Sequence, residues 1–373
     1  MRRLGHLLLQ HHFRLPDAAV QSLNTNSKRT IGTLAPDGWK GFSFVTLGFH
    51  IAVAISLVFL PHPVLPQDVP YEVISSLSER LEAWDVEDTW AEVKILLERN
   101  PKHARLLELA SQIAFHRGDY PEALKLMKSA IEHGGESEKR RGLALFFEET
   151  IGVVNPFKRY ESPHFVISLD EKQDGILAEY IIDGLEKTYQ AMAQHYNFQP
   201  KEKVRIEIFP DTKAFYFAST LSARDIEVTG AVGLAQFNKL MVLSPRALVY
   251  GYRWLDAISH EYMHYLIMKL THNKAPIWFH EGFAKYEETR WRNGPSYLSP
   301  LYETLLSRAQ AEGRLIRFER MEPSLVKLDT PEDVQLAYAQ AASAIDFIVA
   351  DRNVFCDGVD DSIREGILNV DAS

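Results

Sequence analysis

Cysteine is nearly absent from this chain of 373 residues, because Cys356 is the only one. A single thiol excludes an intramolecular disulfide, a cysteine-based zinc knuckle and a Cys-x-x-Cys redox pair. An excess of positive charge is also missing, since 41 basic and 50 acidic side chains leave a formal net charge of −9. This balance argues against a general nucleic-acid binder, which carries a basic surface. With 46% hydrophobic and 24% charged residues, the chain is neither disordered nor low in complexity, and its length predicts roughly two or three folded units.

Residues 42–60 form a long apolar run, FSFVTLGFHIAVAISLVFL, which contains no formal charge. As a helix it is long enough to cross the ~30 Å hydrocarbon layer of a membrane. Six basic residues but only two acidic ones precede it. The positive-inside rule therefore predicts a basic cytoplasmic segment over 1–40, a transmembrane signal anchor over 41–60, and the rest of the chain outside the cytoplasm. No small-x-small cleavage site follows the run, so we expect the anchor to be uncleaved. The alternative is a buried helix of a soluble core, in which case the protein would be a cytosolic one.

Four prolines make residues 61–70 a stiff linker, and helical periodicity follows over 71–150. The stretch HARLLELASQIAFHRGDYPEALKLMKSAIEHG (103–134) is broken once, at Gly118, which predicts two short antiparallel helices. Its small and aromatic residues resemble those of a tetratricopeptide repeat, and the preceding segment is similar to a degenerate neighbouring repeat. The resemblance implies a surface on which a protein partner docks; the alternative is a plain helical spacer.

The period changes near residue 160. Segments 164–170, 204–211, 230–237 and 239–245 have the pattern of strands, whereas 176–196, 252–271 and 277–290 have helical periodicity. Strands followed by helices predict an α+β domain with a mixed sheet over 160–320, and a helical C-terminal tail over 321–373.

The predicted helix over 252–271 contains the sequence His260-Glu261-Tyr262-Met263-His264. Residues i and i+4 lie on the same face of a helix, so His260 and His264 can bind one Zn²⁺ through their imidazole nitrogens. Glu261 lies beside the metal and is placed to take a proton from a bound water. The alternative is an amphipathic helix whose histidines have no metal.

A second helix carries the next candidate, Glu281, in the segment APIWFHEGFAKYEE (275–288). The turn between the two helices can return Glu281 to the first helix as a third metal ligand. Two histidines, one carboxylate and an open fourth position are typical of catalytic zinc sites. Together, the HExxH sequence and the P-x-W-(apolar)-x-E-G-x-A-x-Y pattern that begins at Pro276 resemble the gluzincin metallopeptidases of the peptidase-MA-like family.

That resemblance implies a zincin-like fold, zinc as the cofactor, and further functional residues. It implies a later tyrosine that stabilises the oxyanion, for which Tyr338 is the candidate; the alternative is a packing aromatic. Many gluzincins have an acidic residue four positions after the third ligand, where this chain has Lys285. Asp256, one turn before His260, is a candidate replacement that orients the histidine, or else a salt-bridge residue. His280 adjoins Glu281 but points away from it on a helix, so we leave it off the metal.

The sequence thus predicts a membrane-anchored zinc metallopeptidase that hydrolyses peptide bonds, with Glu261 activating a zinc-bound water. Its partners would be a peptide or protein substrate, and the segment 230–237 could supply an edge strand for an extended peptide. The competing prediction is a membrane-tethered interaction protein of the tetratricopeptide type, in which the zincin-like domain is catalytically inactive.

Overall fold

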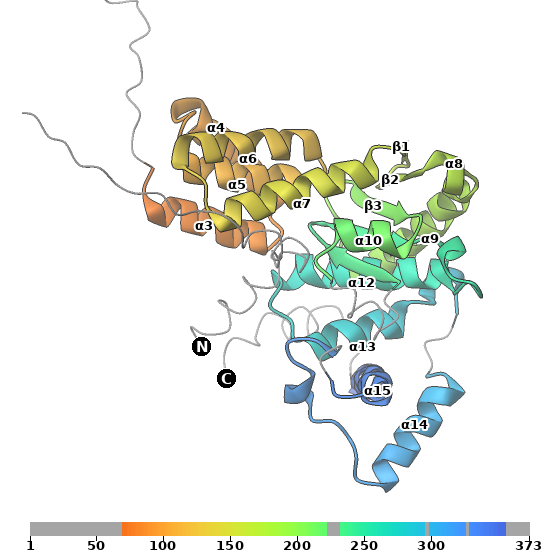
Figure 1. Ribbon diagram of the computed structural model, residues 1–373. Coiled ribbons are helices and arrows are strands. Elements are labelled where there is room, and N and C mark those ends of the chain that lie inside the picture. The colour runs from red at the N-terminus through yellow and green to blue at the C-terminus, as the bar shows by residue number, and fades with distance from the viewer. Residues whose placement is uncertain (1–68, 222–231, 295–297, 326–327, 356–373) are drawn as a thin grey trace, which may run out of the picture.

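The computed structural model describes residues 69–221, 232–294, 298–325 and 328–355 (Figure 1). The predicted cytoplasmic segment and the predicted transmembrane anchor over 41–60 lie outside these residues, as does nearly all of the linker. Within the described ranges, none of the helices combines the length and the apolarity needed to cross a membrane.

Five helices open the described chain: α3 (Tyr71–Glu82), α4 (Val86–Arg99), α5 (Ala104–His116), α6 (Tyr120–Gly134) and α7 (Glu138–Val154). The break between α5 and α6 follows from local chemistry. Gly118 has a φ of +74°, a conformation that costs a residue with a Cβ more than it costs glycine. The Asp119 side chain then accepts a hydrogen bond from the Glu122 N–H and caps α6. The helical hairpin predicted over 103–134 is therefore present.

The sheet has five strands in the order β1-β2-β3-β5-β4. They are β1 (Phe157–Glu161), β2 (Phe165–Asp170), β3 (Val204–Phe209), β4 (Gly233–Gln236) and β5 (Lys239–Leu243). The central strands β2, β3 and β5 run parallel, and both edge strands run antiparallel to their neighbours. The α+β class and the mixed sheet are thus confirmed. Strand β1 was not predicted, because most of its side chains are exposed and the segment has no apolar face.

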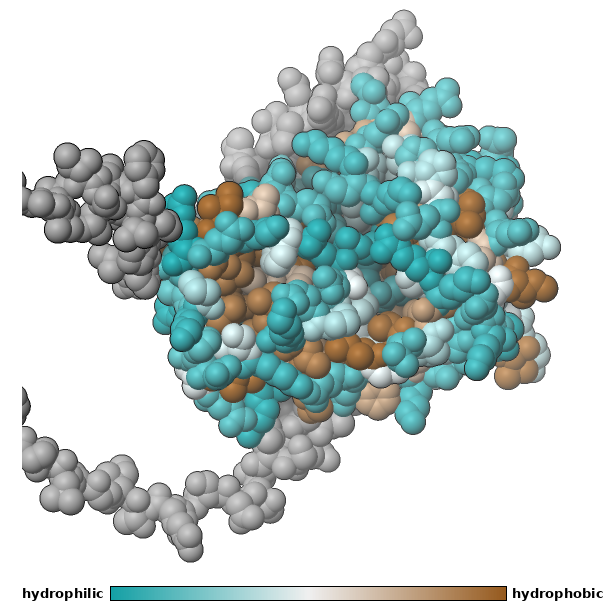
Figure 2. All heavy atoms as spheres, turned by 90° about the horizontal axis from the view of Figure 1, so that it is seen from above, coloured by the Kyte–Doolittle hydropathy of each residue, from teal (hydrophilic) through white to brown (hydrophobic). Residues whose placement is uncertain are grey.

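Helices cover both faces of the sheet (Figure 1). On one face, strand residues such as Ile167, Ile206 and Leu240 pack against α9 (Ala178–Tyr196) and α12 (Trp254–Thr271). On the other face, Met241 of β5 shares a core with Phe115 of α5 and the following helices. The helices α5–α7 therefore form a layer on this face of the sheet together with the short helix α10 (Thr212–Ala218), and α3 and α4 pack against α5. The short helices α8 (Glu171–Asp174) and η1 (Gly175–Leu177) follow β2 in the chain. Seen from above, the molecule is largely hydrophilic with hydrophobic residues interspersed (Figure 2).

A buried ion pair links this helical layer to the sheet. Lys239 of β5 is fully buried and donates a 2.7 Å hydrogen bond to Glu207 of β3. The Tyr120 hydroxyl of α6 contacts both the Lys239 amine and the Glu207 carboxylate. Buried charges are stable only when they are paired, so these three residues tie α6 to the sheet.

The remaining elements follow the sheet: η2 (Pro245–Ala247), α13 (Ile277–Glu287), η3 (Arg290–Arg292), α14 (Pro300–Ala311), η4 (Phe318–Met321) and α15 (Pro331–Phe355). Helix α15 belongs to the predicted C-terminal tail, yet it packs directly on α13. A Cβ on Gly282 of α13 would lie 2.6 Å from the Ala341 carbonyl oxygen of α15. Only glycine permits this approach, and it places the tail helix against the helix that carries Glu281.

Candidate metal centre

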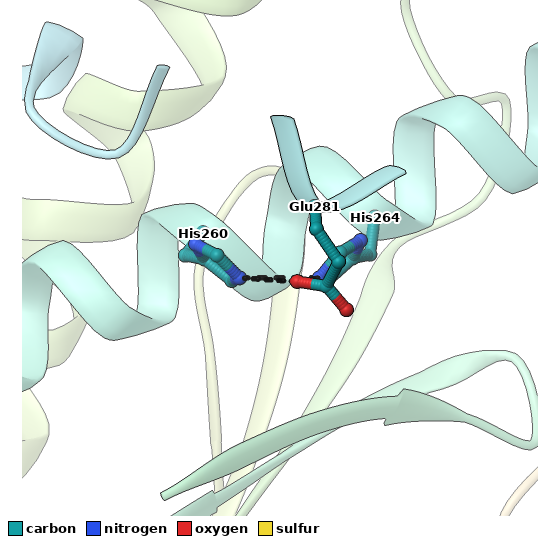
Figure 3. A group of neighbouring side chains, drawn as sticks. All are labelled: His260, His264 and Glu281. Carbon is teal, nitrogen blue, oxygen red and sulfur yellow. Dashed lines mark hydrogen bonds and ion pairs between the residues drawn. The ribbon is translucent and has the colours of Figure 1, made fainter. Parts of the chain in front are cut away.

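Two consecutive helices bring the predicted ligands together. His260 and His264 lie one turn apart on α12, and Glu281 lies on α13 (Figure 3). Helix α12 ends at Thr271, because the next residue, His272, is left-handed with a φ of +51°, as is Asn273 at +61°. Pro276 then precedes α13, and the Glu322 carboxylate accepts a 2.6 Å hydrogen bond from the Ile277 N–H at its start. The turn returns the chain so that Glu281 faces α12.

The three ligand atoms form a compact triangle. The two histidine Nε2 atoms are 3.2 Å apart, and each lies 3.5 Å from Oε2 of Glu281 (Figure 3). Ligands about 2.0–2.1 Å from a tetrahedral Zn²⁺ are separated from one another by about 3.3–3.4 Å. The observed separations match this edge, and two imidazoles with one carboxylate are donors that suit zinc. The residues present therefore fit the ion.

The electrostatics of the cluster favour a cation. Burial alone would raise the pKa of Glu281, but the positive charge of His264 and hydrogen bonds with both histidines hold it far below its usual range. Burial alone would lower the pKa of His260, whereas the carboxylates of Glu281 and Glu288 raise it to about 10. Three carboxylates, those of Glu261, Glu281 and Glu288, thus surround His260. A proton on the imidazole is one way to balance this negative charge, and a metal ion is another.

Glu261 lies beside the cluster without belonging to it. Its side chain is buried, and burial raises its pKa, although the neighbouring positive charges of His264 and His260 oppose the rise. The backbone of Ala235 in β4 hydrogen-bonds to its carboxylate. A Cβ on Gly233 would lie 2.5 Å from Oε1 of Glu261, so the carboxylate rests against the edge strand. A carboxylate with a raised pKa is a suitable general base near neutral pH.

Tyr338 comes to the site from α15. Burial and the negative charges of Glu281 and Glu261 raise the pKa of its phenol well above the ordinary value. Tyr302 of α14 is a second tyrosine on this side, and the sequence reasoning missed it. Burial raises its pKa as well, as do the charges of Glu288 and Glu281, while Lys285 opposes the rise.

Two other sequence candidates lie away from the metal ligands. Asp256 accepts hydrogen bonds from Trp291 Nε1 at 2.9 Å and Arg292 Nε at 3.0 Å, and forms an ion pair with Arg253. Of the two roles proposed for Asp256, the salt-bridge role is the one the contacts support. His280 is buried, and its ring centre lies 5.7 Å from that of His264. Burial and the nearby charge of His264 lower its pKa to about 3, so the ring is neutral, and it is not part of the ligand triangle.

Glu288 contacts His260, and the sequence did not lead us to expect this contact. Its Oε2 lies 3.5 Å from Nδ1 of His260, the nitrogen on the side of the ring away from the cluster. A signal existed, because Glu288 follows Glu281 by seven positions and so lies on the same face of the helix two turns later.

Comparison with known proteins returns no match: no protein family, curated protein or solved structure matches the chain.

Proposed function

We propose that this chain is a zinc-dependent metallopeptidase of the gluzincin type, in which His260, His264 and Glu281 hold the metal. The observation that carries the proposal is the ligand triangle, whose 3.2 and 3.5 Å edges suit a tetrahedral ion. The zincin-like fold is part of the proposal, as is the anchor over residues 42–60 that would keep the enzyme at the outer face of a membrane.

Zinc bound at this site would supply a Lewis acid that polarises a carbonyl and makes water acidic enough to deprotonate near neutral pH. The residues of the chain supply the proton transfers. Glu261 accepts a proton from the attacking water and returns it to the leaving amine, a cycle for which its raised pKa is suited. Tyr338 keeps its proton at neutral pH and can donate a hydrogen bond to the oxyanion that develops on the substrate.

A peptide substrate is supported by the position of β4. This strand lies at the end of the sheet order, and its neighbour on the inner side is β5. Among the described strands none pairs with its outer edge, so an extended peptide could pair there with the outer backbone groups other than the Ala235 N–H, which bonds to Glu261. The Glu261 carboxylate rests against the same strand at Gly233, so a peptide paired with β4 would pass beside the proposed base.

The test is hydrolysis of a quenched-fluorescent peptide library by the full-length chain and by Glu261→Gln. The amide cannot accept the proton, so we expect turnover to fall by at least ~10³-fold, while bound zinc stays near one equivalent. Full activity in Glu261→Gln would refute the assignment of the base. A zinc-loaded parent chain with no activity on any peptide would instead favour the inactive, partner-docking protein, whose docking surface would be α3–α7.

A further inference from the structure

The inference concerns how His260 is held, and it rests on the proposed function. The Nε2 atom of His260 faces the ligand triangle, and its Nδ1 atom lies 3.5 Å from Oε2 of Glu288. The other carboxylate oxygen of Glu288, Oε1, accepts a 2.7 Å hydrogen bond from the amine of Lys285. The two oxygens of Glu288 thus have different partners, one on α12 and one on its own helix. The carboxylate is mostly buried, with 17% of its side chain exposed.

A histidine that binds a metal through Nε2 carries its proton on Nδ1. That proton is generally donated to a carboxylate or carbonyl, which fixes the tautomer and the orientation of the ring and makes Nε2 a better donor. The carboxylate one turn before His260, Asp256, is occupied by Arg253, Arg292 and Trp291. Glu288 is the carboxylate whose contact with Nδ1 the structure records. Its 3.5 Å separation is longer than an ordinary N–H···O bond, as is common for site hydrogen bonds before the ligand binds.

We propose that Glu288 is a positioning residue that accepts the Nδ1–H of His260 and directs Nε2 of that ring to the metal. Position 285, four residues after Glu281, holds a lysine, so the carboxylate that orients the ligand histidine is supplied one helical turn further along the same face.

A purely structural role for Glu288 would be the i,i+3 ion pair with Lys285, and a matched variant separates the two roles. Lys285→Met removes that ion pair and leaves the contact with His260. Glu288→Ala removes both contacts. Glu288→Gln keeps an acceptor of the same length and loses the charge.

The experiment measures zinc affinity of the full-length chain by competition with a chelator, together with the visible absorption spectrum of the Co²⁺-substituted protein. We expect Glu288→Ala to weaken zinc binding by ~10–100-fold and to shift the Co²⁺ bands. Glu288→Gln should fall between Glu288→Ala and the parent, and Lys285→Met should stay within about threefold of the parent with unchanged bands. Should Glu288→Ala fail to fold, the isosteric Glu288→Gln carries the comparison.

An affinity for zinc that is the same in Glu288→Ala and in the parent would overturn the inference and leave the proposed function standing. An equal loss in Lys285→Met and Glu288→Ala would also overturn it, since the ion pair would then explain the effect. A parent chain that binds no zinc would instead refute the proposed function itself.

Discussion

A substitution at Gly233 in the edge strand β4 would displace the proposed base, Glu261. A Cβ at this position would lie 2.5 Å from Oε1, 2.6 Å from Cγ and 2.8 Å from Cδ of Glu261. These are its three nearest atoms, so Gly233→Ala acts on Glu261 before it acts on a metal ligand. Carbon and oxygen atoms in ordinary contact lie at least 3.4 Å apart, and the Glu261 carboxylate must therefore move by about 1 Å.

A displacement of that size is large for catalysis. Misplacing a reacting group by about 1 Å lowers the rate by ~10²-fold, which corresponds to about 2.7 kcal/mol of activation free energy. We expect Gly233→Ala to lose this much in kcat while zinc affinity stays within about threefold of the parent. The loss should appear in kcat more than in KM, because the base acts in the transition state.

The assay is peptide hydrolysis under saturating zinc, with zinc content measured on the same samples. Gly152→Ala is the control, since Gly152 lies on the exposed face of α7 and its Cβ would meet no atom within 4 Å. A Gly233→Ala enzyme with full kcat would refute the placement of Glu261 against β4. Loss of zinc in that variant would show that the substitution disturbs the ligands and not the base alone.

Three further predictions concern other parts of the molecule. Lys239→Met leaves the Glu207 carboxylate buried without its cation, so urea unfolding should show a loss of about 3–5 kcal/mol; the double variant with Glu207→Gln should recover part of it, and additive losses would contradict the pairing. Tyr338→Phe should lower kcat by ~10²-fold with KM and zinc content unchanged, and an unaltered kcat would leave Tyr338 as a packing residue. Burial and the charge of Glu79 raise the folded-state pKa of Glu82 to about 7, so the folded chain binds a proton that the unfolded chain has released. Stability from this group is therefore present below about pH 4.5 and lost as pH rises through 7; Glu82→Gln should be the more stable protein at pH 8.5 and equal at pH 4, and parallel curves would contradict this.

Much of the fold was predictable because its central elements carry strong local signals. Strand β2 is largely apolar, strand β3 alternates apolar residues with Arg205 and Glu207, and the helices α12 and α13 have helical periodicity bounded by turn residues. The ligands His260 and His264 followed from the i,i+4 geometry of a helix. Glu281 needed only the return of the chain at His272 and Pro276, which is a local turn.

The features that escaped prediction depend on contacts between distant segments. Lys239 is the first residue of a strand, where a lysine is expected to be exposed. It is fully buried because Glu207 and Tyr120, 32 and 119 positions away, are its partners. Tyr302 lies near the site because α14 packs against α15 and the Lys285 amine lies 5.6 Å from the centre of its ring, contacts that no local sequence pattern predicts. Glu288 is the exception, since its spacing from Glu281 was visible in the sequence.

Zinc per chain, measured by elemental analysis on the full-length protein, tests the metal centre most directly. We predict close to one equivalent in the parent and its loss in His264→Ala, which removes one corner of the ligand triangle. A folded parent chain that holds no zinc after reconstitution would contradict the metallopeptidase proposal.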